Sequence, residues 1–177
     1  MYAMHKENLV GCQWVESPVG RLNIKASADG VVSVKRINNQ VLQAEANPAD
    51  KTPVVQRAIN NHLAQAKDEL EAYFCGELTR FTVALHLRGT GFQQQVWRAL
   101  QQIGYGQCCS YQDIADSISR PNAVRAVGAA NGANPVAVIV PCHRVIGKNG
   151  KLTGYAYGVE MKRFLLELEQ GNKRDTV

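Results

Sequence analysis

The sequence predicts an α+β protein of two small domains, an N-terminal α/β domain with an antiparallel sheet and a mostly helical C-terminal domain. Three observations predict this class. Short β-type segments separated by turn residues occupy residues 12–35, and apolar residues recur at helical spacing after residue 92. Two glycines at 87–91 separate these two parts of the chain. A length of 177 residues accommodates two such units. We therefore expect a first domain at 1–86, a linker at 87–91, a second domain at 92–170 and a flexible tail at 171–177.

A β-meander is expected at the start of the first domain. Ser-Pro-Val-Gly at 17–20 and Asp-Gly at 29–30 are turn compositions, and the segments beside them are short. The expected strands are residues 12–16, 22–26 and 31–35, followed much later by 81–85, where polarity alternates.

A long helix separates the third and fourth expected strands. Apolar residues recur at helical spacing from residue 54 to residue 74. Thr52 is the expected N-cap, and Pro53 suits the first helical position because its missing N–H would have no partner there. Gly76 is expected to end the helix.

Helices dominate the second domain. Apolar residues at helical spacing predict a helix at 92–103, which the glycines of 104–106 end. Ser110, with Asp113 three residues later, is a capping arrangement for a helix reaching about Ile118. A final helix is expected at 159–169.

A further short helix is expected at 123–131, capped by Asn122. With the helix before it and a turn of about four residues, it resembles a helix-turn-helix. Arg125 is its one long charged side chain, and small residues predominate around it. Small residues allow a helix to lie close to a nucleic acid, but they also allow tight packing inside a protein. The small residues are Ala123, Ala126, Gly128, Ala129 and Ala130.

The net charge of +5 lies mainly in the second half of the chain. Residues 1–91 carry 10 Lys and Arg against 9 Asp and Glu, whereas residues 92–177 carry 10 against 6. A basic bias suits a polyanionic partner, although an ordinary solvated surface has the same composition. Combined with the helix pair and a reactive-looking cysteine, it favours contact with nucleic acid.

Several classes of protein are disfavoured. No stretch approaches 18 consecutive apolar residues, and the first residues form no secretory signal. Five cysteines are an odd number in a chain too large to need disulfides, which predicts a reducing, cytoplasmic location. The cysteines and histidines of the first half have no close paired spacing, so we expect no metal and no cofactor.

The segment Pro141-Cys142-His143-Arg144-Val145 is the strongest candidate site. It follows an apolar, β-branched run at 136–140, which predicts a buried strand or extended core segment. Pro141 then turns the chain, so that a cysteine stands at the edge of the core with a histidine and an arginine beside it. Neighbouring basic groups convert a thiol into the nucleophilic thiolate. The alternative is a small buried cysteine with no chemical role.

These residues resemble the O6-alkylguanine-DNA alkyltransferase family. The similarity covers at least residues 88–170, and the first domain fits the family's ribonuclease H-like domain. The motifs that carry the resemblance are Pro141-Cys142-His143-Arg144-Val145, Arg125-Ala126-Val127-Gly128, Asn134-Pro135, the Gly154-Tyr155 loop and a last helix containing Glu169.

The resemblance implies a single-turnover repair reaction on double-stranded DNA. Cys142 would take a methyl or other alkyl group from O6 of guanine, and also from O4 of thymine, in an irreversible step. His143 would act as its base through a water, with Glu169 orienting the imidazole. Asn134 would brace the cysteine turn, and Tyr111 would donate a hydrogen bond to the base and crowd the adjacent phosphate. The protein is expected to act as a monomer.

The resemblance also implies how DNA is held. The 123–131 helix would lie in the minor groove, and Arg125 would fill the gap left by a flipped nucleotide. The implied DNA contacts on that helix are Ala123, Ala126, Ala129 and Ala130. The implied base pocket consists of Val145, Tyr155, Ala156 and Tyr157. Ala156 lacks a hydroxyl that some members carry, and Tyr157 is bulky where others have glycine.

Two rival functions are less favoured. A module that recognises alkylated DNA without transfer would lack the cysteine, which is present here. A Cys-His hydrolase would leave the helix pair and Arg125 without a role.

Overall fold

The computed structural model describes residues 10–37 and 52–174, and the chain divides into two compact units between Leu87 and Arg88. Each unit has its own core, and the α+β class is confirmed. No helix in the described part of the chain is long and apolar enough to cross a membrane.

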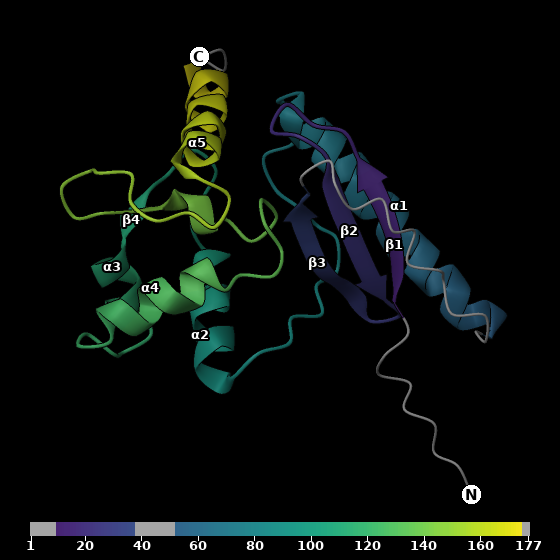
Figure 1. Cartoon of the computed structure of the whole chain (residues 1–177), viewed down its shortest axis with the longest axis horizontal. Helices are drawn as coiled ribbons and strands as arrows, with labels where there is room; N and C mark the ends of the chain where they lie inside the picture. Colours follow the sequence, from purple (N-terminus) through teal and green to yellow (C-terminus); the bar gives the residue numbers. More distant parts are fainter. Residues whose placement is uncertain (1–9, 38–51, 175–177) are drawn as a thin grey trace, which may run out of the picture. The chain divides into compact units, whose positions relative to one another are not determined.

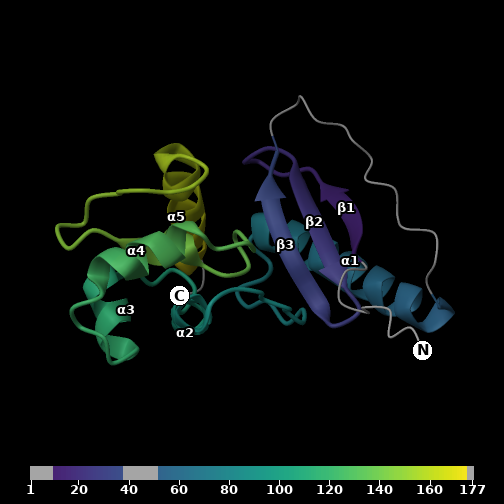
Figure 2. The same cartoon turned by 60° about the horizontal axis from the view of Figure 1, so that its bottom comes forward.

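The N-terminal unit is a three-stranded antiparallel meander covered by one long helix. The strands β1 (Gly11–Val15), β2 (Leu22–Ser27) and β3 (Gly30–Arg36) are hydrogen-bonded in chain order. Helix α1 (Pro53–Phe74) packs against all three strands (Figures 1 and 2). The expected meander and helix are therefore confirmed. Their core consists of Val15, Leu22, Ile24, Ala26, Val31, Val34, Ile59, Leu63, Ala66, Leu70 and Tyr73.

The expected strand at 81–85 is wrong. Only Leu85 forms a bridge, parallel to Val31 of β3. The backbone N–H groups of Thr82 and Val83 instead donate to the Glu69 carboxylate of α1, at 2.9 and 3.1 Å. Because a side chain takes these donors, they are not available for a strand ladder.

The helix ends follow the sequence signals only in part. Thr52 occupies the N-cap position of α1 as expected, but its side chain accepts no capping hydrogen bond. Pro53 is the first helical residue, as expected. Gly76 follows the helix with a φ of 78°, the left-handed conformation that glycine adopts most readily.

The described part of the C-terminal unit, residues 88–174, contains four α-helices. They are α2 (Gly91–Leu100), α3 (Tyr111–Ser117), α4 (Val124–Gly132) and α5 (Val159–Arg174). Two short parallel strands, β4 (Cys109–Ser110) and β5 (Val145–Ile146), join distant parts of the chain and were not predicted. Helix α4 packs against α2 and α3 (Figure 1). The indole N–H of Trp97 donates to the Ala130 carbonyl at 2.8 Å.

Caps explain where the first helices of this unit begin. Ser110 and Asp113 form the predicted capping box of α3. Thr90 and Gln93 form a second box at α2, within the segment interpreted as a linker. Asn122 does not cap α4. The N-cap position is Ala123, which has no capping side chain.

Two helix ends differ from the prediction. Helix α2 ends at Leu100 rather than residue 103. Helix α5 continues past residue 169 to Arg174, through part of the predicted tail, and residues 175–177 lie outside the described chain.

The apolar run at 136–140 is buried as expected, but it is a compact turn rather than a strand. The Val140 N–H donates to the Val136 carbonyl at 3.0 Å, and Val138 adopts a φ of 70°. A positive φ is unfavourable for a β-branched residue, so the surrounding core must hold it. This turn delivers the chain to Pro141 and the cysteine.

Candidate active site

Cys142 begins a single 3₁₀ turn, η2 (Cys142–Arg144), that is buried on all sides. Pro141 occupies its N-cap position, and the Cys142 side chain is buried. The amide of Asn131, in α4, donates to the Cys142 carbonyl at 3.3 Å. The helix expected to approach DNA is therefore tied directly to the cysteine.

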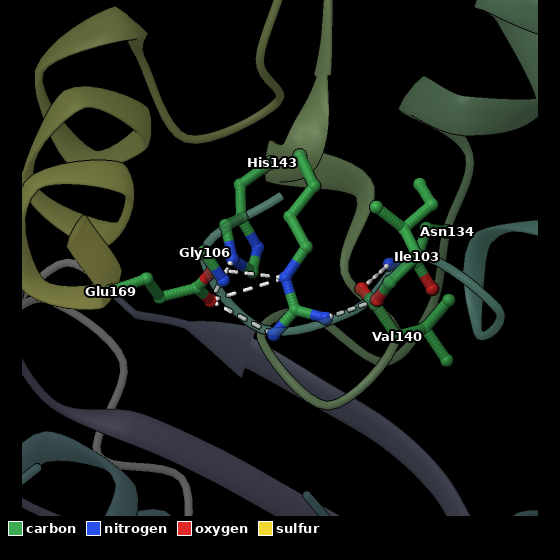
Figure 3. A network of polar contacts seen from close by, with 7 residues as sticks. Ile103, Gly106, Asn134, Val140, His143 and Glu169 are labelled. Carbon is green, nitrogen blue, oxygen red and sulfur yellow. Dashed lines mark hydrogen bonds and ion pairs between the residues drawn. The ribbon is translucent and has the colours of Figure 1, made fainter. Parts of the chain in front are cut away.

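Asn134 holds the turn that precedes Cys142. Its amide nitrogen lies 2.9 Å from the Val140 carbonyl and 3.0 Å from the Cys142 sulfur, and its carbonyl accepts the Val136 N–H at 3.0 Å. Figure 3 shows Asn134 directed at Val140 across this turn. One buried amide thus both shapes the turn and contacts the Cys142 sulfur.

Burial raises the pKa of the Cys142 thiol, and its neighbours oppose that rise only in part. The Asn134 amide, the Tyr155 hydroxyl and the Lys162 ammonium each lower it. The net shift is upward, so the resting group is the thiol. A base must take its proton when it reacts.

His143 meets Glu169 in the interior. Both side chains are fully buried, and His143 Nε2 lies 2.8 Å from Glu169 Oε1. Figure 3 shows Glu169 reaching from α5 toward His143. Residues that lie 26 positions apart in sequence thus form one pair.

Arg144 anchors the same carboxylate. Its guanidinium donates to Oε2 of Glu169 at 2.9 Å and to Oε1 at 3.0 Å, a bidentate pairing. Its remaining nitrogen donates to the Ile103 carbonyl. The Gly106 N–H adds a further hydrogen bond to Glu169 at 2.9 Å. These donors hold the buried carboxylate in one position (Figure 3).

These contacts determine which nitrogen of His143 carries the proton. Burial opposes the charge on Glu169, but the bonds from His143 and Arg144 outweigh it and lower its pKa to about 2. An ionised carboxylate only accepts hydrogen bonds, so Nε2 of His143 must donate. Burial lowers the pKa of His143, which keeps the ring neutral. Nδ1, which is buried without a hydrogen-bond partner among the described residues, therefore carries the lone pair.

Lys162 is a buried cation that sequence reasoning missed. It is fully buried, and its ammonium donates to the carbonyls of Val145 at 2.6 Å and Thr153 at 3.0 Å. It also lies 6.0 Å from the centre of the Tyr111 ring. Burial lowers its pKa, and Cys142 opposes that shift. Lys162 thus ties the end of the cysteine turn to the following loop and favours the thiolate.

Three tyrosines surround the approach to Cys142. The Tyr111 hydroxyl donates to the Thr153 carbonyl at 3.4 Å. The rings of Tyr155 and Tyr157 meet edge to face, with centroids 5.8 Å apart. Burial and then Cys142 raise the pKa values of Tyr111, Tyr155 and Tyr157. All three are therefore protonated at neutral pH and available as hydrogen-bond donors.

The other two predicted pocket residues differ in exposure. Val145 is fully buried, and its carbonyl is the acceptor for Lys162. Ala156 is exposed. The Tyr155 hydroxyl is buried and forms no hydrogen bond of ordinary geometry with a described residue, although it lies close enough to Cys142 to affect the thiol.

The predicted DNA-contact residues of α4 divide into two groups. Arg125, Ala126 and Ala129 are exposed, and Ala123 is half-buried. Ala130 is only 3% exposed, and its carbonyl accepts the Trp97 indole N–H. Ala130 therefore supports the packing of α4 on α2, and its side chain is not part of the exposed surface that could contact DNA.

The sequence carries a signal for the burial of Lys162 that sequence reasoning did not use. Lys162 lies seven residues before Glu169, so both lie on one face of α5, among the apolar residues Met161, Leu165 and Leu166. Charged residues on an apolar face indicate buried partners. Arg144 stands inside the cysteine motif, but its partner lies too far along the chain for the sequence to indicate it.

No group of three or more His, Cys, Asp or Glu side chains suited to holding a metal ion occurs among the described residues. The constellation of a buried thiol, a neutral imidazole and an ionised carboxylate supports nucleophilic chemistry by the thiol.

Family models match both units of the chain. The 6-O-methylguanine DNA methyltransferase ribonuclease-like domain matches residues 10–87, and the DNA binding domain of the same methyltransferase matches residues 91–171. The methylated-DNA–protein-cysteine methyltransferase of Mycobacterium bovis is 49% identical over 156 residues, covering 88% of this chain and 90% of that protein. The Methanosarcina acetivorans protein of the same name is 46% identical, covering 87% and 94%.

Solved structures of proteins of this kind are also similar to this chain. The crystal structure of Mycobacterium tuberculosis OGT in complex with DNA is similar at a TM-score of 0.76 and 45% identity, covering 91% of this chain and 93% of that one. An O6-methylguanine DNA methyltransferase from Methanococcus jannaschii is similar at a TM-score of 0.62 and 27% identity, covering 89% and 93%.

Proposed function

This chain belongs to the 6-O-methylguanine DNA methyltransferase family, and from that premise we propose that it repairs DNA by transferring an alkyl group from O6 of guanine to Cys142. It is a methylated-DNA–protein-cysteine methyltransferase, and its partner is double-stranded DNA that carries the lesion. The proposal extends to O4 of thymine, where the alkyl group is bonded to an oxygen of the same kind.

One observation carries the assignment of roles. His143 presents the unprotonated Nδ1 because its Nε2–H is held by Glu169, and the residue directly before it in the chain is the buried Cys142. Nδ1 takes the thiol proton, through a water in the proposed path. Glu169, held by Arg144, stabilises the imidazolium that results.

The transfer step is a displacement at carbon. The thiolate sulfur forms a bond to the alkyl carbon while the bond from that carbon to O6 breaks, and the electron pair of the broken bond leaves with guanine. Guanine then needs a proton or a hydrogen-bond donor. Tyr111 is the proposed donor, because its raised pKa keeps its hydroxyl protonated and it lies beside Lys162.

The product explains why each molecule acts once. Transfer leaves a thioether on Cys142, and a thioether has no bond that water cleaves under cellular conditions. A Cys-His hydrolase would instead form a labile thioester, and its function would not require a DNA-binding domain. Stoichiometric transfer is therefore the function that the site supports best.

The helix-turn-helix of α3 and α4 is the proposed DNA surface. A small-residue face with Ala126 and Ala129 exposed allows α4 to approach the minor groove closely, and Arg125 is the long side chain on it. O6 of a paired guanine is out of reach of a buried thiol, so the nucleotide must rotate out of the stack. Arg125 is proposed to occupy the vacated space.

A cytoplasmic location is also proposed. All five cysteines are in the thiol form, and Cys142 must stay reduced to react.

The decisive test is the intact mass of the protein after incubation with duplex DNA containing O6-methylguanine. One added methyl group per chain is expected, and peptide mapping should place it on Cys142. The Cys142→Ser variant should bind the same DNA and gain no methyl group. Cys75→Ser is the matched control, because it removes an exposed thiol and should leave transfer unchanged. Methylation of a different cysteine, or turnover beyond one equivalent, contradicts the proposal.

A further inference from the structure

Two adjacent cysteines open onto a groove that the proposed repair reaction does not use. The groove has a volume of about 550 Å³ and lies between the end of α2, α3 and the segment joining them. Cys108 is exposed, Cys109 is half-buried, and both line this groove in the thiol form. Neither Cys142 nor His143 contributes to its wall.

The two thiols have different electrostatic surroundings. Burial raises the pKa of Cys109 to about 11, and the nearby Asp113 carboxylate and Cys108 add to the rise. Cys108 lies close enough to Lys162 to favour the ammonium form of that lysine. Cys108 is the more exposed of the two, so a reagent in the groove reaches it first, and Cys109 is a protonated thiol beside it.

A pair of neighbouring thiols in a groove suits a soft electrophile that takes two sulfur ligands. A metal ion that needs three or four protein ligands does not fit this site, since no group of three His, Cys, Asp or Glu side chains suited to a metal occurs in the described part of the chain. Trivalent arsenic bearing one organic substituent needs only two thiolates, and sulfur is its preferred donor by softness. The groove gives the substituent room beside Ile103 and Ile114.

We propose that Cys108 and Cys109 form a dithiol binding site for monosubstituted trivalent arsenicals, separate from Cys142. The Cys108 thiol attacks arsenic of the arsenoxide, and its proton passes to the arsenoxide oxygen as the first arsenic–sulfur bond forms. The Cys109 thiol then forms the second bond, and its proton leaves with the arsenoxide oxygen and the first thiol's proton as one water. Arsenic stays trivalent throughout, so the step needs no oxidant or reductant.

Occupation of this site also slows alkyl transfer, a consequence that rests on the proposed function. Cys109 belongs to β4, which pairs with β5 through Cys109 and Val145. Ser110, the next residue, caps α3, whose first residue is Tyr111. An arsenical that bridges Cys108 and Cys109 constrains the backbone of β4 and therefore strains its pairing with β5, which follows the cysteine turn.

Binding is tested by intact mass after incubation of the full chain with phenylarsine oxide. The wild-type protein should gain one phenylarsenic group, which an excess of a dithiol such as 2,3-dimercaptopropanol removes and an equal excess of a monothiol does not. The Cys108→Ser and Cys109→Ser variants should each bind ~100-fold more weakly or worse, because the second bond no longer forms at high effective concentration.

Two matched variants separate this site from the other thiols. Cys142→Ser and the double variant Cys12→Ser/Cys75→Ser should take up the arsenical as the wild type does. Unchanged uptake of the arsenical by Cys108→Ser or Cys109→Ser, or uptake that depends on Cys142, would contradict the proposed dithiol site.

The coupling has its own measurement. Single-turnover methyl transfer should slow in arsenical-treated wild type and stay unchanged in the treated Cys108→Ser/Cys109→Ser variant. Equal rates with and without the bound arsenical overturn the coupling. Absence of methyl transfer in untreated protein would instead count against the proposed function, and the mass measurement would still decide the site.

Discussion

Glu169 Oε1 lies 2.8 Å from His143 Nε2, and neither side chain has measurable exposure to solvent. The same carboxylate accepts hydrogen bonds from two guanidinium nitrogens of Arg144 and one from the Gly106 N–H. A buried carboxylate with this many donors stays ionised, and it therefore dictates the tautomer of His143. The orientation of the proposed base depends on a residue of the last helix.

Replacing Glu169 by Gln should slow alkyl transfer by about 10²- to 10⁴-fold, because the amide neither stabilises the imidazolium nor enforces the tautomer. The measurement is single-turnover methyl transfer at saturating protein. DNA binding should be unchanged, which separates chemistry from recognition. Because the substitution removes the charged partner of Arg144, circular dichroism is the control, and it should show that the variant is still folded. A rate within about twofold of wild type would show that Glu169 has only a structural role.

The rate of alkyl transfer should fall as the pH drops through the pKa of His143, which burial places below its ordinary value of 6.5. Protonation of Nδ1 removes the base, while Cys142 remains a thiol across this range because burial raises its pKa. The measurement is the single-turnover rate against pH on free O6-benzylguanine, which avoids the pH dependence of DNA binding. A rate that is flat below pH 6.5 would contradict the proposed base.

Acid should destabilise the fold through Glu169. Its pKa is about 2 in the folded chain against 4.5 for the free group, so the ionised form stabilises the fold above about pH 4.5. That stability is lost as the pH falls from 4.5 toward 2, and the shift corresponds to on the order of 3 kcal/mol. Urea unfolding at several pH values measures it. Glu169→Gln should flatten the dependence in this window, and an unchanged slope would assign the acid sensitivity to other carboxylates.

Arg125→Ala should slow repair of duplex DNA by roughly ten- to a thousandfold, equivalent to ~1.4–4 kcal/mol. The lost side chain would no longer offset the cost of rotating the nucleotide out of the stack. Reaction with free O6-benzylguanine should barely change, because no flipping is needed. Arg120→Ala is a matched control, since it removes another exposed arginine from the turn between α3 and α4. Equal slowing on both substrates would remove Arg125 from the flipping step.

Tyr157→Gly should speed the reaction with O6-benzylguanine more than the reaction with O6-methylguanine DNA. The Tyr157 ring packs against Tyr155, and the interaction with Cys142 helps raise the pKa of Tyr157. The ring is therefore close to Cys142, where a bulky alkyl group would have to lie during transfer. The ratio of the two second-order rate constants is the measurement. Tyr157→Phe keeps the ring and should leave that ratio near its wild-type value. Equal effects of the glycine variant on both substrates would exclude the steric account.

Local signals determined much of the architecture without any tertiary information. The turn residues at 17–20 and 29–30 set the meander, and helical periodicity with Pro53 set the start of α1. Ser110 and Asp113 formed the predicted capping box because both partners lie within four residues of each other. The segment Pro141-Cys142-His143-Arg144-Val145 indicated the proposed nucleophile and the proposed base for the same reason, since these residues are contiguous in sequence.

Tertiary structure decided what depends on partners distant in sequence. The apolar run at 136–140 has β-type composition, but Asn134 and the enclosing core fold it into a turn that a periodicity argument does not distinguish from a strand. Residues 81–85 do not form a strand because the backbone N–H groups of Thr82 and Val83 donate to the carboxylate of Glu69 in α1. The pairing of Arg144 with Glu169 and the burial of Lys162 arise only when α5 packs on the cysteine turn. Burial then sets the protonation states of these groups, because the cost of a buried charge depends on the donors around it and not on its own sequence position.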